Sequence, residues 1–154
     1  MKSHKTFAAA LSLSAVMGVA VAFSPVHAHK GATGVVKERM MAMKSMGRQM
    51  KELGAMVTGK TPYDADRARE IAAALSEHVK EIPDQFPKDS LDPPTEALPR
   101  IWKNWEDFRT KATETLRAAE KLAASAGDGR QSALAAAGAL GKSCKSCHSD
   151  YREK

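Results

Sequence analysis

Both cysteines of the 154-residue chain lie near its C-terminal end, in the run Cys144-Lys145-Ser146-Cys147-His148. Two cysteines three residues apart, followed at once by a histidine, form the pattern through which c-type haem is attached to protein. On a helix, Cys144 and Cys147 lie one turn apart on one face, where their thiols can add to the two haem vinyl groups. His148 is then placed to bind the iron as its proximal ligand. The run predicts one covalently attached haem c per chain.

The cysteine pair has other interpretations. A structural disulfide or a thioredoxin-like redox pair uses the same spacing, and an exported protein meets an oxidising compartment. A thioredoxin-like site, however, needs a strand before its helix, and the chain shows no strand pattern. Structural zinc needs four ligands, and outside the motif only His29 and His78 remain after residue 28 as imidazole or thiol donors. We favour haem and keep a haem-free protein with a disulfide as an alternative.

The ligand on the opposite face of the iron decides the function, because a second strong ligand favours electron transfer and a vacant position favours gas binding. Five methionines fall within eleven residues: Met40, Met41, Met43, Met46 and Met50. At about 100° per residue, Met41 points away from Met43, whereas Met50 shares its face about two turns later. Helical geometry leaves Met43 and Met50 as the leading candidates. His78 is a rival, since imidazole is also a good iron ligand.

Apolar residues recur at helical spacing through four stretches, and no stretch alternates with period two, so the pattern predicts an all-α protein. The first helix is expected from about Thr33 to Leu53, ended by Gly54 or Gly59. Its expected seam consists of Val36, Met40, Met43, Gly47, Met50 and Gly54. The second helix is expected to begin at Thr61, as N-cap, with Asp64 completing a capping box. Its expected inward face is Ala68, Ile71, Leu75, Val79 and Ile82.

Five prolines between Pro83 and Pro99 predict a long connection, because no helix interior tolerates such a density. A third helix follows, with an apolar stripe from Leu98 to Leu122, and the fourth is expected from about Arg130 to the end of the chain. Four amphipathic helices with the longest connection in the middle predict an antiparallel four-helix bundle holding the covalent haem.

Residues 1–28 are predicted to be a secretory signal peptide, with a basic start at Lys2 and Lys5, an apolar run and a cleavage site at Val26-His27-Ala28. The run is short for a membrane span and contains serine and glycine, which disfavours an anchor. Its removal leaves one domain, residues 29–154, with a net charge of +4. The lysines are interleaved with acids, which indicates solvated helix faces and disfavours nucleic-acid binding.

Taken together, these features resemble the class II c-type cytochromes, which include cytochrome c′ and its low-spin, methionine-ligated relatives. The resemblance covers residues 29–154: the four-helix pattern, the haem motif followed by Tyr151-Arg152, and Arg39 four residues before Met43. Residues 50–55 and 60–64 are similar to a segment of the methionine-ligated members. In that branch the methionine matching Met43 is the sixth ligand, so the resemblance favours Met43. It also implies that Arg152 binds a haem propionate or lies beside the proximal imidazole; the alternative is a solvated arginine, and Arg39 has a similar choice.

The sequence therefore predicts an exported, periplasmic carrier of single electrons, with His148 and Met43 on the iron. We find no catalytic constellation, so we do not expect an enzyme. The expected partners are periplasmic redox proteins, and Lys142 and Lys145 would guide docking to an acidic surface. The alternative is a five-coordinate cytochrome c′ that binds or scavenges nitric oxide. Three outward apolar residues, Val35, Met41 and Met56, are too few to choose between a monomer and a homodimer.

Overall fold

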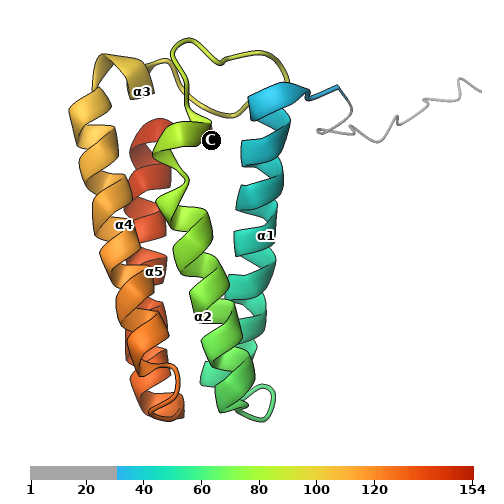
Figure 1. The fold of residues 1–154 in the computed structure, drawn as a ribbon, viewed down its shortest axis with the longest axis vertical. Helices are drawn as coiled ribbons and strands as arrows, with labels where there is room; N and C mark the ends of the chain where they lie inside the picture. Colours follow the sequence, from blue (N-terminus) through green and yellow to red (C-terminus); the bar gives the residue numbers. More distant parts are fainter. Residues whose placement is uncertain (1–30) are drawn as a thin grey trace, which may run out of the picture.

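The computed structural model describes residues 31–154 and contains four long helices that run along the long axis of the molecule (Figure 1). The predicted signal peptide and cleavage site lie outside the described residues. The long helices are α1 (Gly34–Val57), α2 (Ala65–Lys80), α4 (Trp105–Ser125) and α5 (Arg130–Tyr151). Between α2 and α4 come a 3-10 turn, η1 (Pro83–Gln85), and a short helix, α3 (Arg100–Lys103). The all-α four-helix bundle predicted from the sequence is confirmed.

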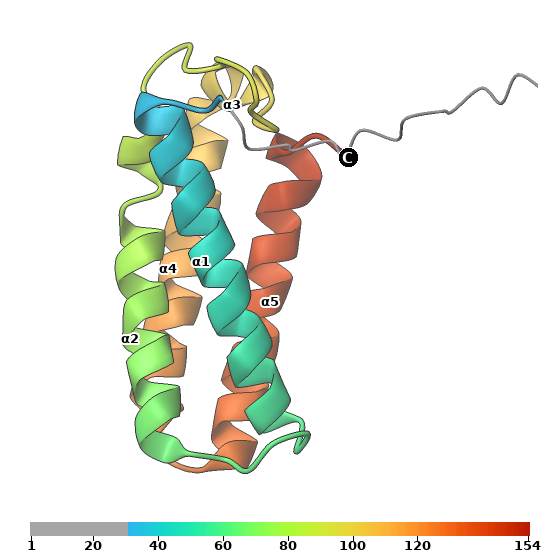
Figure 2. The same ribbon diagram turned by 90° about the vertical axis from the view of Figure 1, so that its right-hand side faces the viewer.

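The two ends of the bundle are closed by different segments. At one end, which we call the loop end, the short connections 58–64 and 126–129 lie side by side. At the other, the crossover end, residues 81–99 pass over the bundle and the chain terminates (Figures 1 and 2). We call residues 81–99 the crossover. Since α1 begins and α5 ends at the crossover end, these two helices are antiparallel neighbours.

Helix α1 is longer than predicted, and its buried face is displaced from the predicted seam. It continues through Gly54 to Val57, because burial of Met56 and Val57 outweighs the roughly 1 kcal/mol that glycine costs a helix. Gly59, at φ +80°, follows as the left-handed residue at the helix end. The buried residues of α1 are Val36, Arg39, Ala42, Leu53, Met56 and Val57. Met56 thus points inward, contrary to the outward position expected for it, and Gly47 in the predicted seam is exposed.

The predicted start of the second helix is wrong by one turn. Asp64 is the N-cap, and its Oδ1 accepts hydrogen bonds of 3.0 Å from the backbone N–H groups of Asp66 and Arg67. Thr61 does not cap α2, because its own N–H donates to the carbonyl of Ala55 and so belongs to the end of α1. The predicted inward face of α2 is confirmed, since all five of its residues are buried.

The third predicted helix is divided in two at Asn104. This residue has φ −121° and ψ 44°, which ends α3 and serves as the N-cap of α4. Trp102 and Trp105 lie on either side of the break, and the Trp102 indole N–H contacts the carbonyls of Phe86 and Pro87 in the crossover. Through Trp102, α3 thus packs against the crossover.

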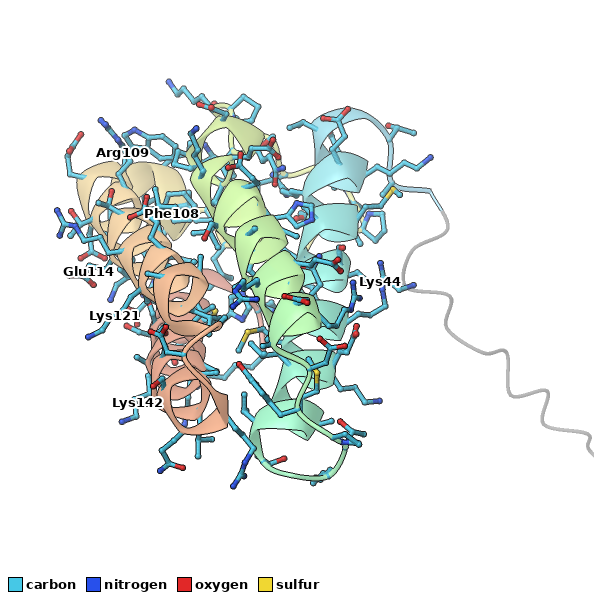
Figure 3. All side chains as sticks on the ribbon, turned by 60° about the horizontal axis from the view of Figure 1, so that its bottom comes forward. Lys44, Phe108, Arg109, Glu114, Lys121 and Lys142 are labelled. Atoms are coloured by element: carbon cyan, nitrogen blue, oxygen red, sulfur yellow. The ribbon has the colours of Figure 1, made fainter. Side chains whose placement is uncertain are left out.

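The core runs the length of the bundle, and charged side chains cover its outside. Arg109, Glu114 and Lys121 project from α4, Lys142 from α5 and Lys44 from α1 (Figure 3). Within residues 31–154, no helix is long and apolar enough to cross a membrane.

Candidate functional site

The two cysteines and His148 lie in the last two turns of α5, at the crossover end. Cys144 and Cys147 are free thiols, half-buried and packed against the hydrophobic core. Burial raises the pKa of the Cys144 thiol and raises that of Cys147 to about 11, although nearby Lys111 opposes the second shift. These pKa values are the opposite of the lowered ones that thiol–disulfide enzymes use. Raised thiol pKa values are typical of cysteines in apolar surroundings.

His148 follows Cys147 directly and is more exposed than the thiols. Partial removal of the ring from solvent lowers the pKa of His148, and the positive charge of Arg152 lowers it further. The neutral imidazole, which is the form that binds iron, is favoured by both effects. Within residues 31–154, no three His, Cys, Asp or Glu side chains are grouped so that they could hold a metal ion.

Arg152 lies just past the end of α5, in extended backbone with φ −119° and ψ 141°. Its Nε donates to Glu96 Oε2 at 2.6 Å, and about half of its side chain is exposed. Arg152 therefore ties the crossover to α5, and the helix ends at Tyr151.

The methionine-rich side of α1 borders the same core as the cysteines. Met43, Met46 and Met50 are half-buried and pack against it. Met41 is 61% exposed, as its predicted position on the far side of the helix requires. His78, the rival ligand, is partly buried in the last turn of α2, which also ends at the crossover end.

Arg39, one turn before Met43, is only 3% exposed, so a solvated arginine is excluded here. Its guanidinium donates to Ser90 Oγ at 2.9 Å, to the Ser90 carbonyl at 2.7 Å and to Thr95 Oγ1 at 2.6 Å. Desolvation lowers the pKa of Arg39, and Asp92 partly offsets this. Sequence reasoning missed this cluster because its acceptors lie more than fifty residues away in the chain.

A buried tyrosine at the end of α5 is a second feature that sequence reasoning missed. Tyr151 donates from its hydroxyl to Asp107 Oδ2 at 2.5 Å and packs edge-on against Phe108. Burial and this hydrogen bond raise the pKa of Tyr151 to about 12. The sequence does contain a signal for this position. Tyr151 follows Cys144 by seven residues, which places both on the same face of a helix.

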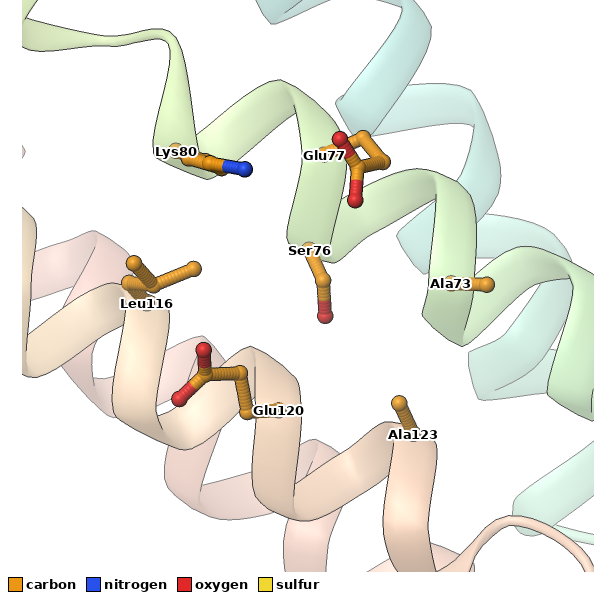
Figure 4. A pocket seen from close by; sticks show the side chains of 7 residues that line it. All are labelled: Ala73, Ser76, Glu77, Lys80, Leu116, Glu120 and Ala123. Carbon is orange, nitrogen blue, oxygen red and sulfur yellow. The ribbon is translucent and has the colours of Figure 1, made fainter.

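A groove open to solvent lies elsewhere, between α2 and α4 (Figure 4). Its lining includes Ser76 and Glu77 from α2 and Leu116 and Glu120 from α4. It contains no thiol and no imidazole, so it does not fit a covalently attached haem.

The residues at the crossover end do fit such a group. The two thiols, one turn apart, could supply the attachment points, and the adjacent imidazole could bind the iron. The half-buried thioether side chains of the facing helix could form an apolar wall. Four-helix bundles characteristically build cofactor sites from facing helices in this way. The fold and the site define a haem-binding helical bundle.

Comparisons with known proteins identify its family. Residues 34–152 match the family described as Cytochrome C'. Cytochrome c-556 of Agrobacterium tumefaciens (strain II Chrys) is 37% identical over 121 residues, which cover 79% of this chain and 98% of that protein. The solved structure of cytochrome c' from Rhodobacter Spheriodes has a TM-score of 0.71 and 34% identity, covering 78% of this chain and 95% of its own. A ferrous variant of cytochrome c prime from Alcaligenes xylosoxidans with bound NO has a TM-score of 0.72 and 28% identity, covering 78% and 94%.

The chain belongs to the cytochrome c′ family of class II c-type cytochromes, whose members are haem proteins rather than enzymes. Family membership implies covalent haem c, for which the C-terminal cysteine pair is present. The predicted family and the expectation that the protein is not an enzyme are therefore confirmed.

Proposed function

We propose that the protein carries single electrons in the periplasm, with haem c attached through Cys144 and Cys147 and the iron bound by His148 and Met43. The observation that carries this proposal is the half-buried position of Met43, which packs against the same core as the two cysteines. A soft, neutral thioether opposite imidazole favours ferrous iron, raises the reduction potential and closes the position that a gas would use.

The level of each methionine along the bundle favours Met43 over Met50. At 1.5 Å per residue, Met43 lies roughly 14 Å from the start of α1, and Cys144 lies roughly 10 Å from the end of α5. Because the two helices are antiparallel, these residues lie at similar levels. Met50 lies roughly 24 Å along α1 and is therefore nearer the loop end. His78 is near the crossover end and is included in the test below.

Arg39 and Arg152 are proposed to contact the haem propionates or, for Arg152, the proximal imidazole. A guanidinium has five N–H donors, and the crossover accepts three of those of Arg39, which leaves two for a carboxylate. Arg152 pairs with Glu96 through Nε, so its Nη groups are free of that contact.

Export to the periplasm rests on the predicted signal peptide, residues 1–28. The proposed partners are periplasmic redox proteins with acidic surfaces, since Lys142 and Lys145 are exposed on the helix that carries the haem motif. Among the large apolar residues of α1, Met41 is exposed and Val35 is partly buried, and the chain is proposed to be a monomer or a homodimer.

A second candidate function is the binding of nitric oxide at a five-coordinate iron. It is favoured by the similarity to the Alcaligenes xylosoxidans protein, whose solved structure has bound NO. In that case Met43 would only fill space, and the position opposite His148 would stay open to ligands.

The test is the absorption spectrum of the haem-loaded protein, oxidised, reduced, and reduced under carbon monoxide. We expect a sharp low-spin reduced spectrum, a weak far-red sulfur–iron band when oxidised, and slow carbon monoxide binding. Met43→Ala should abolish the band and open the iron to carbon monoxide, whereas Met41→Ala, on the exposed side of the same helix, should change neither. Loss of the band in Met50→Ala would instead identify Met50 as the iron ligand. Loss of low-spin character in His78→Ala would identify His78. A high-spin parent protein that binds carbon monoxide readily would instead support the nitric oxide function.

A further inference from the structure

Arg39 is a buried cation that holds together two segments distant in sequence. Its guanidinium reaches from α1 to the crossover, where Ser90 and Thr95 accept its hydrogen bonds. It also lies over the ring of Phe86, with 4.7 Å from Cζ to the ring centroid. Burying a charge is costly unless the charge is paired or well hydrogen-bonded. The crossover supplies those bonds, so its order and the burial of Arg39 depend on each other.

The crossover is also fastened to the end of α5. Leu98 N–H donates to the Tyr151 carbonyl at 3.0 Å, and Glu153 N–H donates to the Glu96 carbonyl at 2.7 Å. The Arg152–Glu96 ion pair lies beside these bonds. The crossover therefore connects the helix that carries Met43 to the residues that follow His148.

Aromatic contacts form a second link between the same two helices. The Phe86 ring, beneath Arg39, packs edge-on against Phe108 at 5.0 Å, and Phe108 packs against Tyr151 at 5.3 Å. This line of contacts runs from α1 through Phe86 of the crossover and Phe108 of α4 to the last residue of α5. A displacement of Arg39 would thus disturb contacts of both α1 and the end of α5, the two helices that flank the haem-attachment region.

We propose that Arg39 is a positioning residue that fastens the crossover to the Met43-bearing turn of α1 and thereby restricts access of external ligands to the iron opposite His148. The inference rests on the proposed function, because it assumes that Met43 faces the iron. It differs from a propionate contact, since the acceptors are Ser90 and Thr95, which belong to the protein. Arg39 acts here through Met43 and the crossover rather than by touching the iron.

The test removes the acceptors and leaves Arg39 in place. The double variant Ser90→Ala/Thr95→Val, in the full haem-loaded chain, loses two of the three hydrogen bonds that Arg39 donates and keeps the arginine available to a propionate. It also removes the bond from the Ala97 N–H to Thr95 Oγ1, so the Ala97 amide is left out of the exchange comparison. The matched control is Thr113→Val/Ser132→Ala, which removes the same two hydroxyl types from exposed positions on α4 and α5. The readouts are amide hydrogen exchange of residues 86–98 and the rate at which the reduced protein binds carbon monoxide.

We expect exchange in residues 86–98 to become about thirtyfold faster in the double variant, because two hydrogen bonds of about 1 kcal/mol each are lost and every 1.4 kcal/mol is a factor of about ten. Carbon monoxide binding should accelerate with it, while the control changes neither. Unchanged exchange would overturn the fastening itself. Faster exchange with an unchanged carbon monoxide rate would overturn the link from the crossover to the iron.

The far-red sulfur–iron band of the parent protein separates this proposal from the proposed function. If the band is absent, Met43 is not the ligand and the electron-carrier assignment fails. The exchange arm then still decides whether Arg39 fastens the crossover, and the carbon monoxide rate still decides whether that fastening limits access to the open site. Failure of one proposal is thus distinguishable from failure of the other.

Discussion

The two ends of the bundle are stabilised in different ways. At the loop end several large apolar side chains are fully buried, among them Leu53 and Leu122. The two loops there contact each other directly, since Tyr63 donates to the Ala126 carbonyl and Arg130 Nη1 donates to the Val57 carbonyl at 3.3 Å. Protein atoms alone complete the core at this end.

Toward the crossover end, the side chains of α1 and α5 around the haem motif are less completely buried, although Val36 and Tyr151 at the same end are buried. Met43 and Met46 on one helix and Cys144 and Cys147 on the other are half-buried, although all four pack against the core. Long-range hydrogen bonds of Arg39 and Tyr151 fasten the surrounding segments. Haem attached as proposed would complete the core at this end, so the stability of the crossover end should depend on the cofactor while that of the loop end should not.

Removing the haem attachment is the largest change that tests this comparison. The double variant Cys144→Ser/Cys147→Ser should lack the covalent mass increase that haem gives the parent protein. Without those apolar contacts, amide exchange at the crossover end should accelerate by more than about tenfold, with a much smaller change at the loop end. Mass spectrometry and hydrogen exchange measure the two effects. Equal acceleration at both ends would mean that the bundle opens as a single unit and that the comparison is wrong.

A cavity at the loop end should lower the stability of the bundle without affecting the haem. Leu122 is fully buried in α4, and Leu122→Ala should lower the free energy of unfolding by about 2–5 kcal/mol. The visible spectrum of the haem should stay unchanged, because the cavity is far from the attachment site. Leu134→Ala, at an exposed position of α5, is the control and should cost little. Denaturant unfolding followed by far-UV circular dichroism gives the comparison, and a spectral shift in Leu122→Ala would show that the two ends are coupled.

The features that were predictable from the sequence are local ones. The haem motif occupies five consecutive residues, and the buried face of α2 follows helical periodicity, so neither needs tertiary information. The start of α2 was harder to predict from the sequence, because Thr61 and Asp64 are both good N-cap residues. The choice between them is made by the Ala55 carbonyl, which takes the Thr61 N–H.

The remaining features depend on contacts between distant residues. Pattern reasoning assigns a charged residue to the surface, and Arg39 is buried only because Ser90 and Thr95 reach it from the crossover. The same burial rotates the inward face of α1 away from the predicted seam, so that the methionines border the core rather than fill its centre. Tyr151 likewise depends on Asp107, which is 44 residues away in the chain.

The smallest expected effect compares one hydroxyl at each end. Tyr151 and Tyr63 each donate a hydrogen bond to another helix or loop, at the crossover end and the loop end respectively. Tyr151→Phe and Tyr63→Phe should each lower the free energy of unfolding by about 1 kcal/mol at neutral pH. Only Tyr151→Phe should accelerate exchange in residues 145–152, because Tyr151 fixes the last turn of α5 beside His148. Equal acceleration there in Tyr63→Phe would contradict the separation of the two ends.

The stability of Tyr151→Phe at alkaline pH gives a second test of the Tyr151 hydrogen bond. An unfolded tyrosine ionises near pH 10, whereas burial and the Asp107 hydrogen bond raise the pKa of Tyr151 to about 12 in the folded protein. Between these values the unfolded chain loses its proton first, so the contribution of Tyr151 is complete below pH 10 and is lost as the pH rises toward 12. Tyr151→Phe removes this contribution, so its stability should fall less steeply than that of the parent protein over this interval. Parallel curves would mean that the Tyr151 hydroxyl titrates normally, and the hydrogen bond to Asp107 would then not be what holds the end of α5.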